Sequence, residues 1–155
     1  MPQITKGGKY VFGWSKIRGN GEFRILDEAV QEYNLETGEK IILASGSKTS
    51  GGFSIAKKSA IAQSAISSIL TENPKLSNFQ IAEGQTIQFK SRRYCWVSIH
   101  DNGLVVLPPS ALEAYGIHSG DCLLSIRSSN IAIGFAVKGP LIEKARKCSK
   151  IEIFE

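Results

Sequence analysis

The chain contains two similar stretches of 40 residues. Residues 14–53 and 96–135 align without a gap at a constant offset of 82 positions. Identical positions include aromatic residues, turn residues and small or branched apolar residues: Trp14/Trp96, Ile17/Ile99, Asn20/Asn102, Gly21/Gly103, Ala29/Ala111, Tyr33/Tyr115, Gly38/Gly120, Gly52/Gly134 and Phe53/Phe135. A tandem duplicate often corresponds to a dimer fused into one chain. We therefore expect each copy to supply the partner surface that the other copy needs.

Both copies carry the same order of predicted elements. An extended segment comes first, at 10–18 and 94–100, and leads into an Asn-Gly turn, which is a strong hairpin signal. A short return strand and a short helix follow; acidic residues open the first helix and prolines open the second. After a glycine turn, two further strands are expected in each copy, at 40–44 and 52–56 and at 122–126 and 131–137.

The hairpins predict how the copies associate. A two-stranded hairpin with one short helix is marginal alone in water, because neither face of the sheet is covered. Two copies that interleave their hairpins hide each other's strand edges. We predict a mainly β, α+β fold with short helices, in which the repeats form one pseudo-two-fold, barrel-like unit. Residues 1–78 hold the first repeat and a helical extension; residues 79–155 hold the second repeat, a C-terminal helix and a final strand.

The extension after the first copy has a helical pattern. Residues 57–70 place Ile61, Ala65, Ile66, Ile69 and Leu70 on one stripe of a single predicted helix. An apolar stripe on an extension needs cover. The pattern therefore suggests a homodimer formed through this helix.

Composition indicates a soluble protein with an ordinary core. Hydrophobic residues make up 42% of the chain, and no apolar run approaches the roughly 18–20 residues of a membrane helix. No signal-peptide core follows Met1, so we expect a cytoplasmic protein that is not associated with a membrane. The net charge of +5 is shared between the halves, with ten Lys/Arg against seven Asp/Glu in residues 1–78 and nine against seven in residues 79–155. Such an excess is compatible with nucleic-acid binding but does not require it.

Cysteine and histidine form no recognisable site. The cysteines are three, without a close pair or a matching histidine cluster, which favours reduced thiols over disulfides or zinc. Cys122 precedes an apolar strand and is expected to be buried. His100 and His118 lack a nucleophile and a carboxylate at a suggestive spacing. We therefore expect no catalytic residue, no metal, no cofactor and no enzymatic activity.

Residues 100–121 (HDNGLVVLPPSALEAYGIHSGD) resemble the core of the AbrB/SpoVT/MazE-like swapped-hairpin family. That core reads as a polar strand end, a glycine, a short apolar strand, proline, a short helix, an apolar-Gly turn, and Gly-Asp before another strand. The first copy matches more loosely through 16–25 and 35–39, and its Arg-Gly-Asn followed by Arg-Ile looks more like the antitoxin branch. The resemblance covers about 40 residues in each copy. It leaves the helical extensions unexplained.

The resemblance implies a transcription factor or antitoxin that binds duplex DNA through basic residues of the hairpin region. A toxin partner is not identified by the sequence. Carried over residue by residue, the best matches are Lys16, Arg18 and Arg24 in copy one. The equivalent positions of copy two carry no permanent cation: Ser98, His100 and Val106. The two copies therefore carry different residues at the positions where a two-fold symmetric DNA contact would require the same cations.

A second basic cluster precedes the second hairpin. Arg92 and Arg93 follow Lys90 and either supplement the weak face of copy two or form a charged sheet edge that discourages aggregation.

Two polar loops occupy equivalent places in the copies. The first contains Ser47, Lys48, Thr49 and Ser50, and the second contains Arg127, Ser128, Ser129 and Asn130. Glycine- and hydroxyl-rich loops expose backbone N–H groups to anions, although the spacing here is not that of a P-loop. They are either mobile hairpin loops or the mouth of an anion site. The second reading gives an alternative function: a small-molecule sensor or protein-interaction module that keeps the fold and does not bind DNA.

Overall fold

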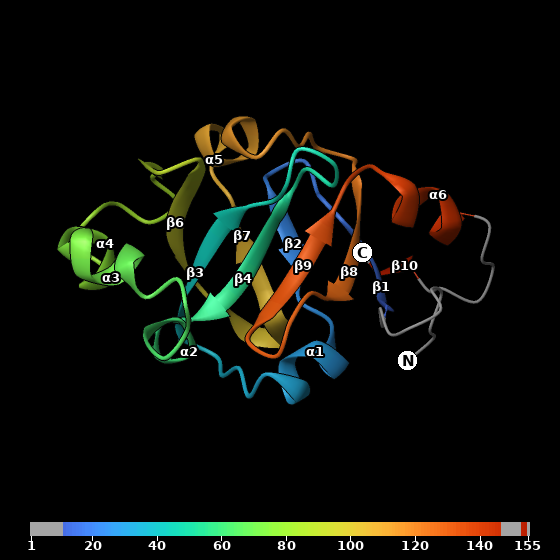
Figure 1. The fold of residues 1–155 in the computed structure, drawn as a ribbon. Helices are drawn as coiled ribbons and strands as arrows, with labels where there is room; N and C mark the ends of the chain where they lie inside the picture. Colours follow the sequence, from blue (N-terminus) through green and yellow to red (C-terminus); the bar gives the residue numbers. More distant parts are fainter. Residues whose placement is uncertain (1–10, 147–152, 155) are drawn as a thin grey trace.

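The computed structural model describes residues 11–146 and 153–154, and these form one large sheet and one two-stranded ribbon (Figure 1). The large sheet has the order β10-β1-β8-β9-β4-β3-β6-β5 and is antiparallel except for β10, which runs parallel to β1. Its strands are β1 (Val11–Lys16), β3 (Lys40–Ser45), β4 (Phe53–Lys57), β5 (Ile87–Phe89), β6 (Arg92–Ser98), β8 (Cys122–Arg127), β9 (Ala132–Ala136) and β10 (Ile153–Phe154). The ribbon pairs β2 (Glu22–Arg24) with β7 (Leu104–Val106). The predicted class, mainly β with short helices, is confirmed.

Short helices lie at the ends and on one face of the sheet (Figure 1). Proline begins α5, as expected from its missing N–H, and Asp27 and Glu28 fill the first turn of α1. The helices are α1 (Asp27–Glu32), α2 (Lys58–Ala62), α3 (Ser68–Glu72), α4 (Pro74–Ser77), α5 (Pro109–Ala114) and α6 (Pro140–Arg146), with a 3-10 turn η1 (Asp101–Gly103) before β7. The final strand was expected around 151–154, and of that segment the structure describes β10 alone.

The strands of each copy pair with strands of the other copy. β1 pairs with β8 and β6 pairs with β3, so Trp14 faces Leu124 while Trp96 faces Ile42. These two pairs are related by the offset of 82 found in the sequence. β2 and β7 pair in the same reciprocal way, because each strand after an Asn-Gly turn crosses to the other copy. The pairing joins segments on both sides of position 78, where the sequence divides into its two repeats; the domain boundary itself stays a prediction.

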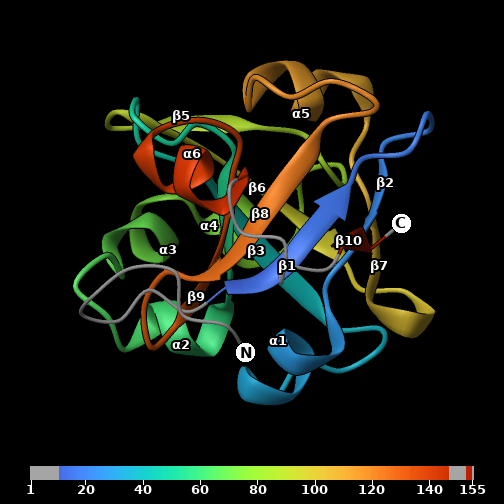
Figure 2. The ribbon, with the colours of Figure 1, turned by 90° about the vertical axis from the view of Figure 1, so that its right-hand side faces the viewer.

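The main core lies between the large sheet and the ribbon. The ribbon is separate from the large sheet and lies beside that sheet (Figure 2). Its centre is aromatic: the ring of Phe23 lies 5.3 Å from those of both Phe53 and Phe135, and the latter two are 5.0 Å apart. Phe53 faces Phe135, and Phe23 faces Val105, in the strand register. Each of these two pairs joins equivalent positions of the copies. The central residues of one copy are therefore buried against the equivalent residues of the other copy.

No closed barrel forms among the described residues. β10 and β5 each have a neighbour on one side only, so the large sheet stays open at both edges. The barrel-like closure expected from the sequence is therefore not what these strands form. The reason is that the return strands β2 and β7 pair only with each other, and they cover the sheet as a separate ribbon instead of closing it.

The prediction of one helix over residues 57–70 is wrong. The segment contains α2 and α3, separated by a turn around Ser64. The Ser64 hydroxyl donates to the Ile61 carbonyl at 2.7 Å, and the Ile66 N–H donates to Ser64 Oγ at 3.2 Å. Serine side chains that bond nearby backbone groups in this way compete with a continuous helix.

The break lets the apolar stripe cover the sheet. Ile61, Ile69 and Leu70 are buried in one cluster with Trp96, whereas Ile66 is 46% exposed. Three of the five stripe residues therefore have cover within the chain, while Ala65 and Ile66 stay exposed. A homodimer through this segment stays a prediction.

The prediction that Cys122 is buried is wrong. Cys122 is exposed at the start of β8, while Cys95 in β6 is buried. Cys122 stands at the strand end beside a turn, and the apolar residues that the sequence pattern buries begin only at Leu123. Burial raises the pKa of the Cys95 thiol to about 11, and the Tyr115 hydroxyl donates to its Sγ at 3.2 Å.

Raising the pH is expected to destabilise the protein through Cys95. An unfolded cysteine loses its proton near pH 8.5, whereas the folded thiol keeps it up to about pH 11. The folded state therefore holds more protons in this window, and the free energy of unfolding falls with rising pH by up to about 3 kcal/mol. Urea unfolding at pH 8 and pH 10.5 measures the loss. It should shrink in Cys95→Ser and persist in Cys122→Ser; an equal loss in all three proteins would contradict the assignment.

Candidate nucleic-acid interface and ligand groove

The exposed face of the β2–β7 ribbon carries the first candidate site. Phe23 and Val105 point into the core, so the alternation of a strand sends Glu22 and Arg24 outward on β2. On β7 the outward residues are Leu104 and Val106, and Val106 is 38% exposed. One strand of the ribbon is therefore charged and the other apolar. This asymmetry follows from the residue differences between the copies.

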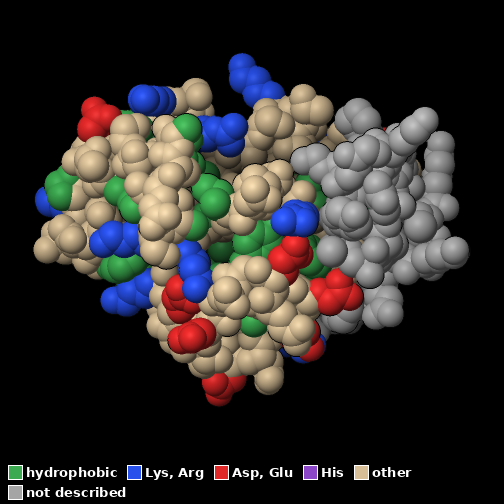
Figure 3. Space-filling view, turned by 60° about the horizontal axis from the view of Figure 1, so that its bottom comes forward, with side chains coloured by type: hydrophobic (Ala, Val, Ile, Leu, Met, Phe, Trp, Pro, Cys, Tyr) green, Lys and Arg blue, Asp and Glu red, His purple; other side chains and the backbone are tan. Residues whose placement is uncertain are grey.

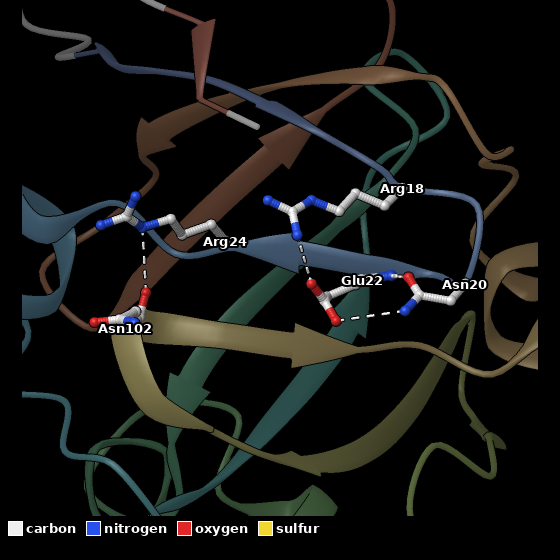
Figure 4. A network of polar contacts seen from close by, with 5 residues as sticks. All are labelled: Arg18, Asn20, Glu22, Arg24 and Asn102. Atoms are coloured by element: carbon white, nitrogen blue, oxygen red, sulfur yellow. Dashed lines mark hydrogen bonds and ion pairs between the residues drawn. The ribbon is translucent and has the colours of Figure 1, made fainter.

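Arg18 lies beside the ribbon at the β1–β2 turn and is held by Glu22 (Figure 4). Its Nη1 is 2.9 Å from Glu22 Oε1, and its side chain is 49% exposed. Asn20 orients the carboxylate: its Nδ2 donates to Glu22 Oε2 at 3.4 Å, and the Glu22 N–H donates to Asn20 Oδ1 at 3.1 Å. The Glu22 carboxylate is thus the ion-pair partner of Arg18 at the candidate interface.

Arg24 crosses to the other copy. Its Nε donates to the carbonyl oxygen of Asn102 at 3.2 Å (Figure 4). Its Nη2 is 3.4 Å from Asp27 Oδ1. Asn102 has a φ of 63°, which the Asn-Gly turn was expected to allow. This hydrogen bond connects Arg24 of copy one to the Asn-Gly turn of copy two.

Lys16 is the last residue of β1, opposite Cys122, two positions before Arg18. The structure thus places Arg18 at the turn before the ribbon, Arg24 on the outward face of the ribbon, and Lys16 on the large sheet next to it. In copy two the equivalent positions hold Ser98, His100 and Val106, as the sequence requires.

The other basic cluster is separate from the Arg24–Asn102 contact. Arg92 and Arg93 begin β6, a strand of seven residues, or roughly 20 Å, and the η1 turn lies beyond its other end. Arg92 Nη1 donates to the Ser45 carbonyl at 2.6 Å, and the Arg93 N–H donates to Ser45 Oγ at 3.0 Å. The structure therefore does not bring this cluster to the turn of copy two that carries Asn102.

Arg92 instead lines a groove on the outer face of the sheet, over β4 and β9. We call it the β4–β9 groove; its volume is about 350 Å³. Polar residues on its lining come from five segments: Ser47, Thr49 and Ser50 between β3 and β4, Ser54 on β4, Arg92, Ser128, and Lys138 after β9. Sequence reasoning missed Lys138, because the position 82 residues earlier is Ala56 and the repeat gives no signal.

The two polar loops do not form one mouth. β4 and β9 are antiparallel, so the loop before β4 and the loop before β9 lie at opposite ends of this pair. Only Ser128 of the second loop reaches the β4–β9 groove. Lys48 lines a different cavity beside Tyr115.

The remaining residues of the second loop are used for internal contacts. Arg127 pairs with Glu32 at 3.2 Å and donates to Asn130 Oδ1 at 3.3 Å. The Tyr33 hydroxyl donates to the Ser129 carbonyl at 2.7 Å; burial, and then Glu32, raise the pKa of Tyr33. This loop is thereby pinned to the end of α1.

The end of the molecule that carries α1 shows charges of both signs rather than a continuous positive surface (Figure 3). Within residues 11–146 and 153–154, no cluster of three histidine, cysteine or acidic residues suits a metal ion. In the same part of the chain, no helix is long and apolar enough to cross a membrane.

Comparison of the chain with protein-family models, with curated proteins and with solved structures gives no match.

Proposed function

We propose that the chain is a DNA-binding transcriptional regulator of the AbrB/SpoVT type, built from two swapped-hairpin repeats fused into one pseudo-two-fold unit. The architectural part rests on the reciprocal pairing of β1 with β8, β3 with β6 and β2 with β7. Equivalent residues meet at the centre of this arrangement, as identical subunits do across a two-fold axis. No cofactor and no chemical step belong to this function.

The observation that carries DNA binding is the placement of Arg18 and Arg24 at the exposed face of the ribbon. Both arginines are accessible and both are already paired with surface carboxylates. Exposed ion pairs of this kind are worth at most about 1 kcal/mol, so phosphate oxygens can replace the carboxylates at little cost. With Lys16 beside them, copy one offers three cations and copy two none at the equivalent positions. DNA contact is therefore expected to be one-sided.

The salt dependence of binding tests this proposal. Three phosphate contacts predict a slope of log K against log salt near −2.7 on duplex DNA. Fluorescence anisotropy with labelled genomic duplexes, at several salt concentrations, measures it. The double variant Arg18→Gln/Arg24→Gln should flatten the slope by about two units. The control Lys75→Gln/Lys90→Gln removes the same charge at exposed positions elsewhere and should leave the slope nearly unchanged. Absence of binding at low salt, or equal behaviour of the two variants, would refute DNA contact at the ribbon.

Removing the carboxylate that pairs with Arg18 is expected to strengthen DNA binding. Glu22→Gln keeps the size of the side chain and frees Arg18 from its ion pair. The affinity should rise about two- to fivefold, which corresponds to the energy of an exposed pair. Glu113→Gln, on exposed surface of α5, serves as the matched control for a change of one charge. Weaker binding by Glu22→Gln than by Glu113→Gln would contradict the arrangement.

A second candidate function is favoured by the β4–β9 groove. It is the small-molecule sensor or interaction module on the same fold, without DNA binding. Two results would distinguish this function from the first: the protein would bind no duplex DNA at low salt, and a small ligand would stabilise it against unfolding.

A further inference from the structure

We infer that the β4–β9 groove binds a small organic molecule bearing a phosphate group. This inference rests on the groove alone and does not depend on DNA binding at the ribbon.

The floor of the groove is made by small side chains at the centre of the sheet. Ser54 on β4 faces Gly134 on β9, and Ala136 continues the row. On either side, buried clusters cover the sheet: Trp96 lies under α2–α4, and Trp14 lies with residues of α6. Figure 1 views this face, with α2, α3 and α4 on one side of β4 and β9 and α6 on the other. The uncovered middle is a hollow rather than a flat surface because its floor residues are short.

Gly134 lets the side chains of Ile126 and Ser128 lie close against the floor of the groove. A Cβ at this position would lie 3.1 Å from Ile126 Cγ1 and 3.3 Å from Ser128 Cβ, which is tighter than ordinary contact. Ile126 gives the floor an apolar part, while Ser128 adds a hydroxyl beside it. The groove thus offers room for an organic body next to polar groups.

The polar rim is held in place before any ligand arrives. The Gly51 N–H donates to the Ser47 carbonyl at 2.8 Å, and the Ser47 and Ser50 hydroxyls are 3.0 Å apart. The Ser50 carbonyl accepts from the N–H groups of Val137 and Lys138 at 2.9 and 3.1 Å. The loop is therefore tied to the end of β9. A preorganised rim lowers the entropy cost of binding.

The charge on the lining is purely positive. Arg92 and Lys138 are its two cations, and no Asp or Glu occurs among the described residues that line it. Arg92 uses one nitrogen on Ser45 and keeps further N–H donors, since a guanidinium has five. Arginine with hydroxyl groups and a lysine is a donor set suited to phosphate oxygens.

Size and surroundings select a small phosphate ester. A volume near 350 Å³ lies at the lower end of the roughly 300–1,000 Å³ of ligand sites. Inorganic phosphate alone would leave the apolar floor uncovered. We therefore assign the groove to a compact metabolite whose phosphate meets Arg92 and Lys138 while its organic part lies over the apolar floor beside Ile126.

Isothermal titration with ribose 5-phosphate, glucose 6-phosphate, adenosine monophosphate and inorganic phosphate tests the inference. We expect at least one ester to bind more tightly than inorganic phosphate. Arg92→Gln and Lys138→Gln should each weaken that ester about tenfold, the usual loss for a charged hydrogen bond. Arg127→Gln, which removes an arginine paired with Glu32 outside the groove, should change the affinity less than twofold. Circular dichroism verifies that each variant is folded.

Three results would overturn the inference. The first is that no ester binds at millimolar concentration, and the second is equal affinity for inorganic phosphate and the esters. The third is displacement of a bound ester by a short single-stranded oligonucleotide in the wild type but not in Arg92→Gln, which would make the groove a nucleic-acid site. The two proposals fail separately: Arg18→Gln/Arg24→Gln should keep ester binding, and Arg92→Gln should keep the salt slope on duplex DNA.

Discussion

Replacing Phe53 by alanine is expected to lower the free energy of unfolding by about 3–5 kcal/mol, the usual loss for a large buried aromatic residue. Phe53 is 1% exposed. Its ring lies within 5.5 Å of the rings of Phe23, Phe135 and Tyr115. Two of these partners belong to the other copy. The substitution therefore removes contacts that hold the copies together, and no nearby side chain can fill the space without leaving its own place.

Urea unfolding followed by circular dichroism measures this loss. Phe89→Ala is the control, because Phe89 is only partly buried on the edge strand β5, with its ring 6.4 Å from that of Tyr94. We expect this control to cost about 1 kcal/mol. The double variant Phe53→Ala/Phe135→Ala should lose less than the sum of its single variants, since both remove the same ring contact. A loss below about 1.5 kcal/mol for Phe53→Ala would show that the aromatic centre does not join the copies.

Replacing Gly21 by alanine is expected to cost about 2–5 kcal/mol, from two separate causes. Gly21 has a φ of +83°, where a side chain is strained. A Cβ there would also lie 2.1 Å from the carbonyl oxygen of Leu107, a backbone atom that cannot move without shifting β7. The Leu107 N–H donates to the Gly21 carbonyl at 3.0 Å, so the turn of one copy rests directly on the strand end of the other.

Gly38→Ala separates the two causes. Gly38 has a similar φ of +87°, but nothing lies within 4 Å of an added Cβ. It should cost only the strain, about 1–2 kcal/mol. Gly103→Ala should behave like Gly21→Ala, because its Cβ would lie 2.5 Å from the carbonyl oxygen of Ile25. Thermal unfolding of the three variants gives the order of their losses in stability. Equal losses at Gly21 and Gly38 would mean that the close approach between the copies contributes nothing.

The duplication explains why the fold was largely predictable. Local signals, such as the Asn-Gly turns, the proline before α5 and the apolar alternation, act over a few residues and occur twice. They placed the eight strands of the two copies close to their observed positions. Prediction failed at residues 57–70, where a helical stripe of period 3.6 is interrupted by the Ser64 turn. Apolar periodicity does not reveal which neighbour a stripe will cover.

The candidate sites were less predictable, because they depend on residues that are distant in the chain. The sequence identified Arg18 and Arg24 but did not show that Glu22 holds Arg18 in an ion pair while Arg24 reaches Asn102 of the other copy. Arg92, Ser128 and Lys138 line one groove although no spacing connects them. The lengths of the two polar loops also differ: β3 and β4 are separated by residues 46–52, and β8 and β9 by residues 128–131. Equivalent positions in a repeat therefore do not give equivalent surroundings.

By itself, the sequence determined the repeat, the order of its elements, the turn positions that require glycine or asparagine, and the absence of permanent cations at the copy-two positions equivalent to Lys16, Arg18 and Arg24. These properties depend on backbone conformation and on residue identity, which are local. Only the tertiary structure decided that β2 and β7 leave the large sheet as a ribbon, that Cys95 rather than Cys122 is buried, and that Arg92 and Lys138 meet at one groove. Those outcomes depend on strand register across the two copies, which brings together residues that no short-range pattern relates.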